Sequence, residues 1–217
     1  LPMLLQLLQV VSQSAEINFG EYSEVIVYPL LAPEDMLKTK SSKMVQYLFH
    51  SFEFTHQKFL QNKRFLFPNT IEELKSLFND KSLILLVDDF VGTGDTAESA
   101  INHLKVNDIS IKDIIILSLV SLREGIEKIE SIGLKIFSSI ILTKAISEYY
   151  TEETLEENIR LMDSIEKKIK VNKHDKFGYK RSEGLVSMLR TPNNTFPVFW
   201  YEKKTYHVLF RGIKIER

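Results

Sequence analysis

Cysteine is absent from all 217 residues of the chain. Disulfide bonds, thiol nucleophiles and zinc sites built from thiolates are therefore excluded. The lack of cysteine favours a reducing, cytoplasmic location. The five histidines form no spacing that is typical of a metal site.

Long apolar runs are also absent. No stretch reaches the roughly 18 uninterrupted apolar residues of a membrane span, so we expect no membrane partner. The net charge of −1 gives no overall attraction to nucleic acid or acidic membranes. Hydrophobic residues make up 44% and charged residues 26%, which is typical of a soluble globular protein with one substantial core.

Apolar strands alternate with amphipathic helices up to about residue 147. Strands are predicted at residues 24–31, 64–67, 82–87, 114–120 and 134–142. Helices are predicted at residues 3–13, 42–62, 96–105 and 124–132, and a further helix, capped by Asn69 or Thr70, runs to about residue 79. Two of the strands are continuously apolar, as in strands that are covered on both faces. We therefore predict an α/β fold with a parallel sheet.

The pattern changes after Thr151. One long amphipathic helix is predicted at residues 151–171, and short β signals follow at 197–200 and 206–210. We predict a core domain at residues 1–147 and a C-terminal α+β lobe at residues 148–217. Such a lobe suits a hood over a ligand site or a surface for a partner.

The most informative stretch spans residues 83–96. A continuous apolar run ends at Asp88 and Asp89, at the predicted carboxyl end of a parallel strand, where open α/β sheets bind their ligands. Gly92 and Gly94 allow backbone conformations that other residues avoid, and they let a ligand approach the main chain. This stretch is therefore the first candidate for a binding site.

The loop predicted at residues 88–95 leads directly into a helix, whose free N–H groups and dipole favour a phosphate. Thr93 and Thr96 add hydroxyl donors. Two carboxylates beside a phosphate cradle suit ribose hydroxyls and a hydrated Mg²⁺ ion. A strand–turn–helix corner with chance acids would leave the acid pair and both threonines unexplained.

This stretch resembles the phosphoribosyl-pyrophosphate (PRPP) signature of type I phosphoribosyltransferases: an apolar run, two acids, three further positions and Thr-Gly-x-Thr. The resemblance implies a Rossmann-like parallel-sheet core, PRPP and a nucleobase-like molecule as substrates, Mg²⁺ as cofactor, and glycosyltransferase chemistry in nucleotide metabolism. It implies that Asp88 and Asp89 hold the ribose hydroxyls and, through the ribose or water, Mg²⁺. The residues implied to hold the 5-phosphate are Gly92, Thr93, Gly94, Asp95 and Thr96.

A second stretch, residues 118–125, is similar to orotate phosphoribosyltransferases, in which an arginine after the next core strand helps to recognise a carboxylated base. The matching residue is Arg123, whose planar guanidinium suits a carboxylate or a base carbonyl. The resemblance implies that Arg123, like the acid pair, belongs to the catalytic group. An ion pair with Glu124 or Glu127 at a helix start would also explain this arginine.

The sequence also departs from the type I pattern. Residues 28–32, after the first strand, have neither the glycine nor the basic residue of a pyrophosphate loop, and no long charged loop lies between residues 62 and 79. Position 92, an aspartate in some members, is glycine, and Asp95 places a negative charge beside the expected phosphate. These departures leave open an alternative, in which the chain is a non-catalytic sensor or effector that binds PRPP or a nucleotide in a larger complex.

A basic run follows the long predicted helix. It comprises Lys167, Lys168, Lys170, Lys173, Lys176, Lys180 and Arg181, with Phe177 and Tyr179 between them. Cations with interleaved rings suit nucleic acid, whereas a solvated helix end explains the same lysines without a partner. A third interpretation is that Lys176, Lys180 or Arg181 reaches the pyrophosphate and replaces the missing loop.

Two last stretches, residues 178–185 and 191–200, contain candidate base or pyrophosphate contacts at Tyr179, Asn193 and Asn194. Aromatic faces stack on bases, although asparagines also brace turns. Both stretches resemble a phosphoribosyltransferase-like group of prokaryotic conflict and defence loci, some of them near retron reverse transcriptases. This resemblance implies an effector role in an antiviral system. A homodimer or a larger complex is left open.

Overall fold

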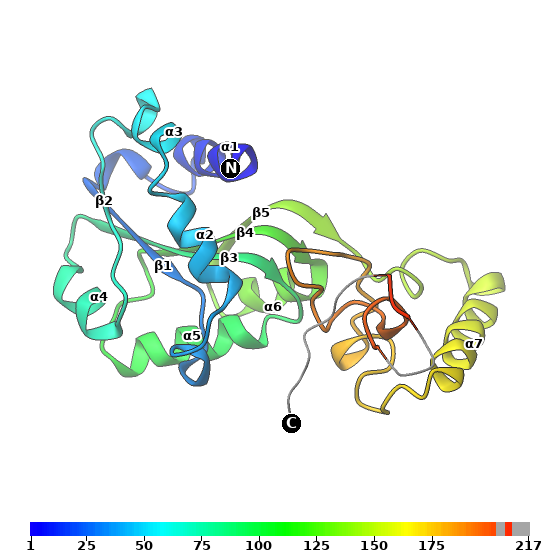
Figure 1. The fold of residues 1–217 in the computed structure, drawn as a ribbon. Helices are drawn as coiled ribbons and strands as arrows, with labels where there is room; N and C mark the ends of the chain where they lie inside the picture. The colour runs from blue at the N-terminus through cyan, green and yellow to red at the C-terminus, as the bar shows by residue number, and fades with distance from the viewer. Residues whose placement is uncertain (203–206, 210–217) are drawn as a thin grey trace.

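The protein is an α/β protein with one parallel sheet (Figure 1). The computed structural model describes residues 1–202 and 207–209. The strands are β1 (Glu24–Pro29), β2 (Arg64–Leu66), β3 (Ser82–Val91), β4 (Ile114–Leu122) and β5 (Lys135–Leu142). Their order across the sheet is β2-β1-β3-β4-β5, and every neighbouring pair is parallel. The predicted fold class is therefore confirmed.

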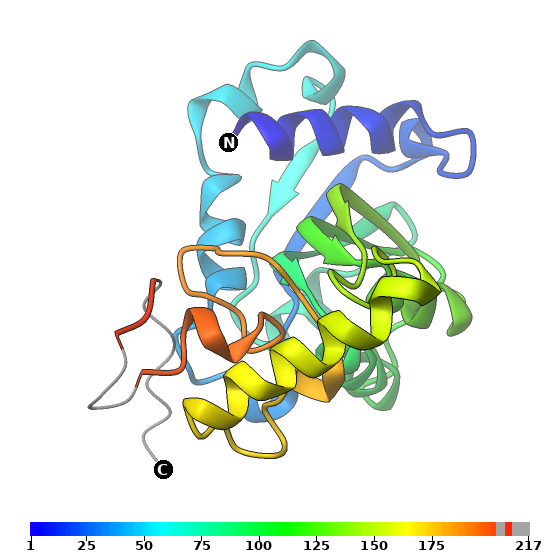
Figure 2. The same ribbon diagram turned by 90° about the vertical axis from the view of Figure 1, so that its right-hand side faces the viewer.

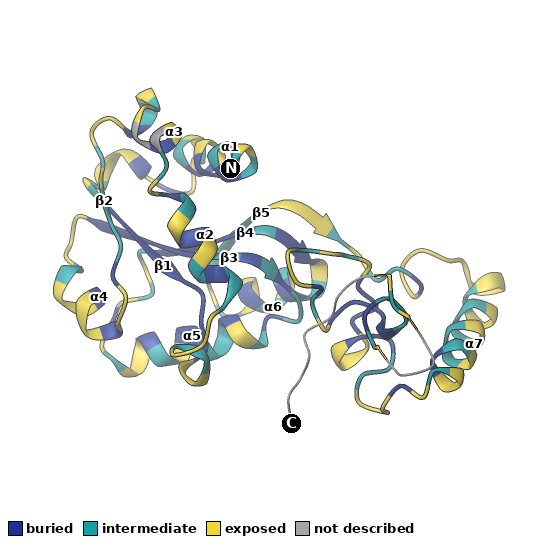
Figure 3. Cartoon of the chain, in the orientation of Figure 1, coloured by how far each residue is buried: buried dark blue, intermediate teal, exposed yellow. Residues whose placement is uncertain are grey.

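Helices cover both faces of the sheet (Figure 1). One face carries α4 (Ile71–Leu77), α5 (Asp95–Val106) and α6 (Arg123–Ser131), and the other carries α1 (Pro2–Gln13), α2 (Ser41–Leu48) and α3 (Phe52–Thr55). Successive side chains of a strand point to opposite faces, so Ile84 and Leu86 pack on the first layer and Leu83 and Leu85 on the second. Burial on both faces explains the apolar run at residues 83–87 of β3 and the largely apolar sequence of β4 (Figure 3).

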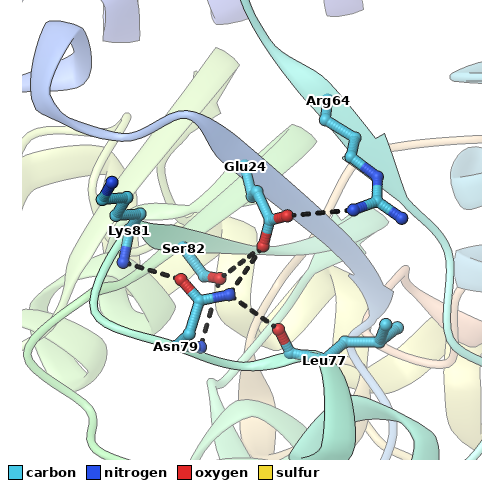
Figure 4. Close-up of polar contacts among 6 residues, drawn as sticks. All are labelled: Glu24, Arg64, Leu77, Asn79, Lys81 and Ser82. Atoms are coloured by element: carbon cyan, nitrogen blue, oxygen red, sulfur yellow. Dashed lines mark hydrogen bonds and ion pairs between the residues drawn. The ribbon is translucent and has the colours of Figure 1, made fainter.

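A network around Glu24 joins the beginnings of three strands (Figure 4). The Glu24 carboxylate accepts hydrogen bonds from Arg64 at 3.2 Å, from the Asn79 amide at 2.7 Å and from the Ser82 hydroxyl at 3.3 Å. The bond from Asn79 is the largest cause that lowers the pKa of Glu24. The amino ends of β1, β2 and β3 are therefore tied together by polar contacts.

At the carboxyl end of the sheet, the central strand β3 extends beyond its neighbour β1. β1 ends at Pro29, which lies beside Val87, while β3 continues to Val91 next to β4 alone. Residues 88–91 therefore have a free edge on the side of β1. In a sheet of this strand order, the connections change direction between β1 and β3, and ligands bind at that switch point.

The C-terminal lobe has a small apolar core of its own, built from Ile146, Phe177 and Phe196. In its described part, residues 148–202 and 207–209, the elements are α7 (Glu152–Lys168) and two 3₁₀ helices, η4 (Tyr179–Arg181) and η5 (Pro197–Phe199). An isolated bridge joins Gly184 to Thr195. Figure 2 shows this lobe in front of the carboxyl ends of the strands. The boundary at residue 147 stays a prediction.

The helix predicted at residues 42–62 is wrong. The structure has α2, α3 and a 3₁₀ helix at Lys58–Leu60 instead. Phe49 and Phe54 are both buried, and their ring centroids lie 4.5 Å apart. On a continuous helix, residues five apart point about 140° away from each other. The chain must therefore break to bury both rings in one core.

Two more predictions need correction. The loop predicted at residues 88–95 is too long, because β3 runs to Val91 and α5 begins at Asp95. The β signal at 197–200 is wrong, since Pro197–Phe199 forms η5. The signal at 206–210 lies partly outside the described residues, and its described part, 207–209, is not a strand. Within the ranges given above, no helix is long and apolar enough to cross a membrane.

A buried carboxyl group supports the lobe. The side chain of Glu166 on α7 is fully buried. The Phe177 N–H donates to both carboxyl oxygens of Glu166, at 3.0 Å to Oε1 and 3.1 Å to Oε2. Burial raises the pKa of Glu166 to about 7, against the Phe177 hydrogen bond and the charge of Lys176. The native lobe therefore holds this proton at a pH where the unfolded chain releases it.

We predict that this group makes stability depend on pH. The stabilisation is fully present below the unfolded pKa of 4.5 and is lost as pH rises through about 7, because the native state binds the extra proton in that window. The loss should be about 1–3 kcal/mol. Urea unfolding of wild type and Glu166→Gln at about pH 5 and pH 8 measures it. In Glu166→Gln, the free energy of unfolding should no longer show this part of its dependence on pH, whereas the exposed Glu156→Gln should keep it. An equal pH dependence in all three proteins would contradict the assignment.

Candidate functional site

The two adjacent acids lie on the free edge of β3. Asp89 is buried and Asp88 is half-buried. The Asp89 N–H donates to Asp88 Oδ1 at 2.9 Å. Burial and then the charge of Asp89 raise the pKa of Asp88 well above its ordinary value, while Lys40 acts in the opposite direction. The structure therefore presents a close pair of carboxyl groups at the switch point of the sheet.

The loop between β3 and α5 is short and tightly packed. Gly94 has a φ of +79°, a left-handed conformation that favours glycine. A Cβ on Gly125 of α6 would lie 2.1 Å from the Gly92 carbonyl oxygen, so the two backbones touch where neither residue has a side chain. The lack of side chains at 92 and 125 thus lets α6 fix the position of the loop.

The loop ends at the N-terminus of α5. Gly94 is the N-cap and supplies no side-chain hydrogen bond, and Asp95 and Thr96 form the first turn. The first N–H groups of a helix have no intrahelical partner, so they remain donors for an anion. The residues 92–96 therefore form a backbone cradle of the kind that suits a phosphate, next to the acid pair. We call residues 92–96 the cradle.

The Asp95 carboxylate is paired with two lysines. Lys128 Nζ of α6 lies 2.6 Å from Oδ1, and Lys180 Nζ of the C-terminal lobe lies 2.6 Å from Oδ2. The Tyr179 hydroxyl also donates to Oδ2 at 3.2 Å. Lys128 bonds Glu98 as well, at 2.7 Å. Two ammonium groups thus balance two carboxylates beside the cradle.

This pairing changes the charge that a ligand meets. Burial acts to raise the pKa of Asp95, but the hydrogen bonds and charges of Lys128 and Lys180 outweigh it and hold the pKa well below its ordinary value. The hydrogen bond to Asp95 in turn raises the pKa of each lysine. The negative charge expected beside the phosphate is therefore neutralised by its own neighbours.

The C-terminal lobe reaches the cradle through a second contact. A Cβ on Gly92 would lie 2.4–2.6 Å from the amide atoms of Asn194, so that amide fills the space of a side chain at position 92. Asn193 is exposed, and its carbonyl accepts the Tyr179 N–H at 2.9 Å. Of the five candidate contacts in the lobe, Tyr179, Lys180 and Asn194 meet the cradle.

The two candidate arginines are both exposed. Arg181 is exposed and its guanidinium stacks 4.1 Å from the Phe177 ring centroid, inside the lobe. Arg123 is the first residue of α6 and is exposed. Glu124, not Arg123, takes part in an ion pair there, with Lys144 at 3.2 Å.

Sequence reasoning missed the N-terminus of α2, which lies beside the acids. Lys40 is its N-cap, is paired with Asp35 at 2.8 Å, and acts on Asp88 electrostatically. Ser42 in the first turn is buried, and its hydroxyl has no hydrogen-bond partner. The sequence contains this feature as Lys40-Ser41-Ser42, but these residues do not directly follow the first strand, where a pyrophosphate loop was expected. Lys128 was also missed, because only the packing of α6 on α5 brings it to Asp95.

The acid pair has the chemistry of a magnesium site that is completed by ligand and water. Oxygen donors are the ones that Mg²⁺ prefers, and it commonly binds one or two carboxylates while keeping several waters. Among the described residues, no group of three or more His, Asp or Glu side chains forms a complete cage. Asp88 and Asp89 therefore fit a hydrated ion that is shared with a bound ligand.

A sequence model of the PRTase-CE family matches residues 23–211, which span the sheet, the cradle and most of the lobe. The chain belongs to the PRTase-CE family. PRTase abbreviates phosphoribosyltransferase, so this membership supports phosphoribosyl transfer as the general chemistry. The matched range includes all the candidate site residues of this PRTase-CE chain.

Two solved structures of orotate phosphoribosyltransferases are similar to this PRTase-CE protein. The enzyme from Aeropyrum pernix is 19% identical, with a TM-score of 0.35 over 72% of this chain and 73% of that chain. The enzyme from Mycobacterium tuberculosis H37Rv, solved with inorganic phosphate, is 18% identical, with a TM-score of 0.33 over 63% and 68%. No curated protein sequence matches the chain.

The contact between Gly125 and Gly92 makes a clear prediction. Gly125→Ala should lower the free energy of unfolding by about 1–3 kcal/mol, although alanine is the better helix former, because its Cβ strikes a backbone oxygen that cannot move freely. The control is Gly20→Ala, where a Cβ meets nothing within 4 Å. That variant should change stability by less than about 0.5 kcal/mol. Equal effects in urea unfolding would refute the steric account.

Proposed function

We propose that this protein transfers a phosphoribosyl group from PRPP to a nucleobase or a nucleotide-like acceptor. The observation that carries the proposal is the acid pair on the free edge of β3, followed at once by a backbone cradle at a helix N-terminus. A sugar phosphate needs both features side by side, since the acids hold its hydroxyls and the cradle holds its phosphate.

Each part of the donor then has a place. Gly92, Thr93, Gly94, Asp95 and Thr96 bind the 5-phosphate, largely through backbone N–H groups. Asp88 and Asp89 accept hydrogen bonds from the ribose hydroxyls. These contacts hold the sugar at the carboxyl end of the sheet and leave its reacting carbon over the edge of β3 that β1 does not cover.

The pyrophosphate group is assigned to the N-terminus of α2. Lys40 is the cation that acts on Asp88, and the Ser42 hydroxyl is a buried donor without a partner. A helix N-terminus with a lysine and a free hydroxyl favours a polyanion. This segment replaces the loop that residues 28–32 cannot form, since Leu30, Leu31 and Ala32 are buried apolar residues.

The reaction breaks the bond between the ribose C1 and the pyrophosphate oxygen, and the electron pair leaves with pyrophosphate. A nitrogen of the acceptor forms the new bond to C1, where positive charge develops. Lys40 and the first N–H groups of α2 stabilise the charge that builds on the departing oxygens. Asp88 and Asp89 keep the ribose oriented while its ring carbon flattens.

Mg²⁺ is the cofactor that these carboxylates suit. Asp88 and Asp89 would hold it, through the ribose hydroxyls or water, and it would supply positive charge against the phosphates of the donor. Arg123 is exposed at the start of α6 and is kept as a candidate contact to the acceptor base.

An effector role in a prokaryotic conflict system is part of this proposal. It is supported by the resemblance of residues 178–185 and 191–200 to a group found in such loci. The buried segment after β1 favours one alternative, a sensor that binds PRPP without turnover. Contact with nucleic acid has less support, because Phe177 is buried and Lys176 is paired with Asp163 at 2.5 Å.

We predict that Asp88→Asn/Asp89→Asn weakens PRPP binding about 100-fold or more, because the amides lose both the charge that attracts Mg²⁺ and two acceptors for the ribose. Isothermal titration with PRPP and Mg²⁺ measures the binding, and release of pyrophosphate over a panel of bases measures the turnover. The exposed Asp108→Asn is the matched control and should bind like wild type. Unchanged affinity in a folded double variant would end the proposal, and tight binding without release under any base would establish the sensor.

A second variant distinguishes the binding site of the pyrophosphate from that of the 5-phosphate. Lys40→Met should weaken PRPP about 10-fold but ribose 5-phosphate less than about 2-fold, because only PRPP carries the pyrophosphate. Lys38→Met is the control, since Lys38 shares the partner Asp35 and is absent from the charges that act on Asp88. An equal loss for both ligands would show that α2 does not bind the pyrophosphate.

A further inference from the structure

Asn194 occupies a space that three glycines leave free. A Cβ on Gly178 would lie 2.1 Å from the Asn194 carbonyl oxygen, and one on Gly184 would lie 2.8 Å from it. A Cβ on Gly92 would strike the Asn194 amide. Two of these glycines belong to the lobe and one to the cradle, so Asn194 is enclosed by both.

The Asn194 amide is held in one orientation from the lobe side. The side-chain Nδ2 of Asn194 donates to the Ser182 hydroxyl at 3.1 Å, and that hydroxyl donates to the main-chain carbonyl of Asn194 at 3.1 Å. The Gly184 N–H donates to the same carbonyl at 2.9 Å. The Ser182 hydroxyl and the Asn194 side chain are both buried. The lobe thus presents a fixed amide to the cradle.

The segment that carries these contacts has an unusual backbone. Phe177, Lys180, Arg181 and Glu183 have φ angles between 50° and 59°, a region that non-glycine residues rarely adopt. Glu183 anchors the segment by accepting the Ile146 and Ser147 N–H groups and the Ser147 hydroxyl. Strained backbone that is held by its surroundings concentrates at functional sites. This segment brings Tyr179 and Lys180 onto Asp95.

We propose that Asn194 is a ligand-contacting residue of the cradle, and that Asp95 is the positioning residue that keeps it there. Asp95 acts through its two lysines: Lys128 fixes it to the core, and Lys180 fixes the lobe to it. The ligand class is a 5-phosphorylated ribosyl compound, so this inference rests on the proposed function. The lobe thereby supplies the polar group that residue 92 lacks.

The steric part is tested by a pair of variants at Gly92 and Asn194. Gly92→Ala should weaken binding of ribose 5-phosphate at least 10-fold, because its Cβ displaces the amide. Asn194→Ala alone should weaken it about 3- to 10-fold through loss of the contact. Gly92→Ala/Asn194→Ala should then bind like Asn194→Ala, because the added methyl group now has room.

The positioning part is tested at Lys180. Lys180→Met should weaken ribose 5-phosphate binding, Lys180→Arg should keep it, and Lys180→Met/Asn194→Ala should bind no worse than Asn194→Ala, since both act through one amide. Lys167→Met is the control, because Lys167 is a lobe lysine whose partner, Asp163, belongs to the lobe itself. Fluorescence of Trp200, the sole tryptophan, measures the packing of the lobe in the absence of a ligand, because the indole N–H of Trp200 donates to the Thr195 carbonyl at 2.7 Å.

The outcomes separate the inference from the proposed function. If wild type binds ribose 5-phosphate and the effects of Gly92→Ala and Asn194→Ala simply add, the steric link is refuted. Tighter binding by Asn194→Ala would show that the amide blocks the site, which also overturns the inference. If Lys180→Met binds like wild type, the positioning role is refuted. If wild type binds neither PRPP nor ribose 5-phosphate, the proposed function itself fails, and this inference fails with it.

Discussion

The close approach of backbones at Gly92 is the constraint on which the rest of the site depends. The backbone of α6 touches the Gly92 carbonyl at Gly125, and the lobe touches Gly92 through the side-chain amide of Asn194. A side chain at either glycine would separate elements that now meet. The loop can therefore be short and rigid, and the N-terminus of α5 is held at a fixed distance from the acids of β3.

The two ends of the sheet show how the fold divides its tasks. At the amino end, Glu24 collects Arg64, Asn79 and Ser82 and leaves little polar capacity free. At the carboxyl end, β3 outruns β1, and its acids lie on an unpaired edge beside a helix N-terminus whose serine hydroxyl has no partner. Polar contacts thus tie the strands together at one end, while at the other end an acid pair and a free hydroxyl remain for a ligand to satisfy.

The sequence predicted what depends on neighbouring residues. The acid pair, the glycines and the start of α5 lie within one stretch, so their order along the chain sets their order in space. The sequence did not predict contacts between distant segments. The ion pair of Lys128 with Asp95 depends on the packing of α6 on α5, and the contact of Asn194 with Gly92 depends on the position of the whole lobe. The predicted helix at 42–62 failed for the same reason, since the shared burial of Phe49 and Phe54 overrides local periodicity.

The two arms of the Asp95 cluster differ in their exposure to solvent. The side chain of Lys180 is 56% exposed, while those of Lys128 and Asp95 are each 30% exposed. Dissolved ions screen exposed charges most strongly, with a Debye length of about 8 Å at physiological ionic strength. The arm from the lobe therefore weakens first as salt is added, and the arm from α6 persists. The ionic composition of the surroundings thus acts on how firmly the lobe is seated, without any change to the core beneath it.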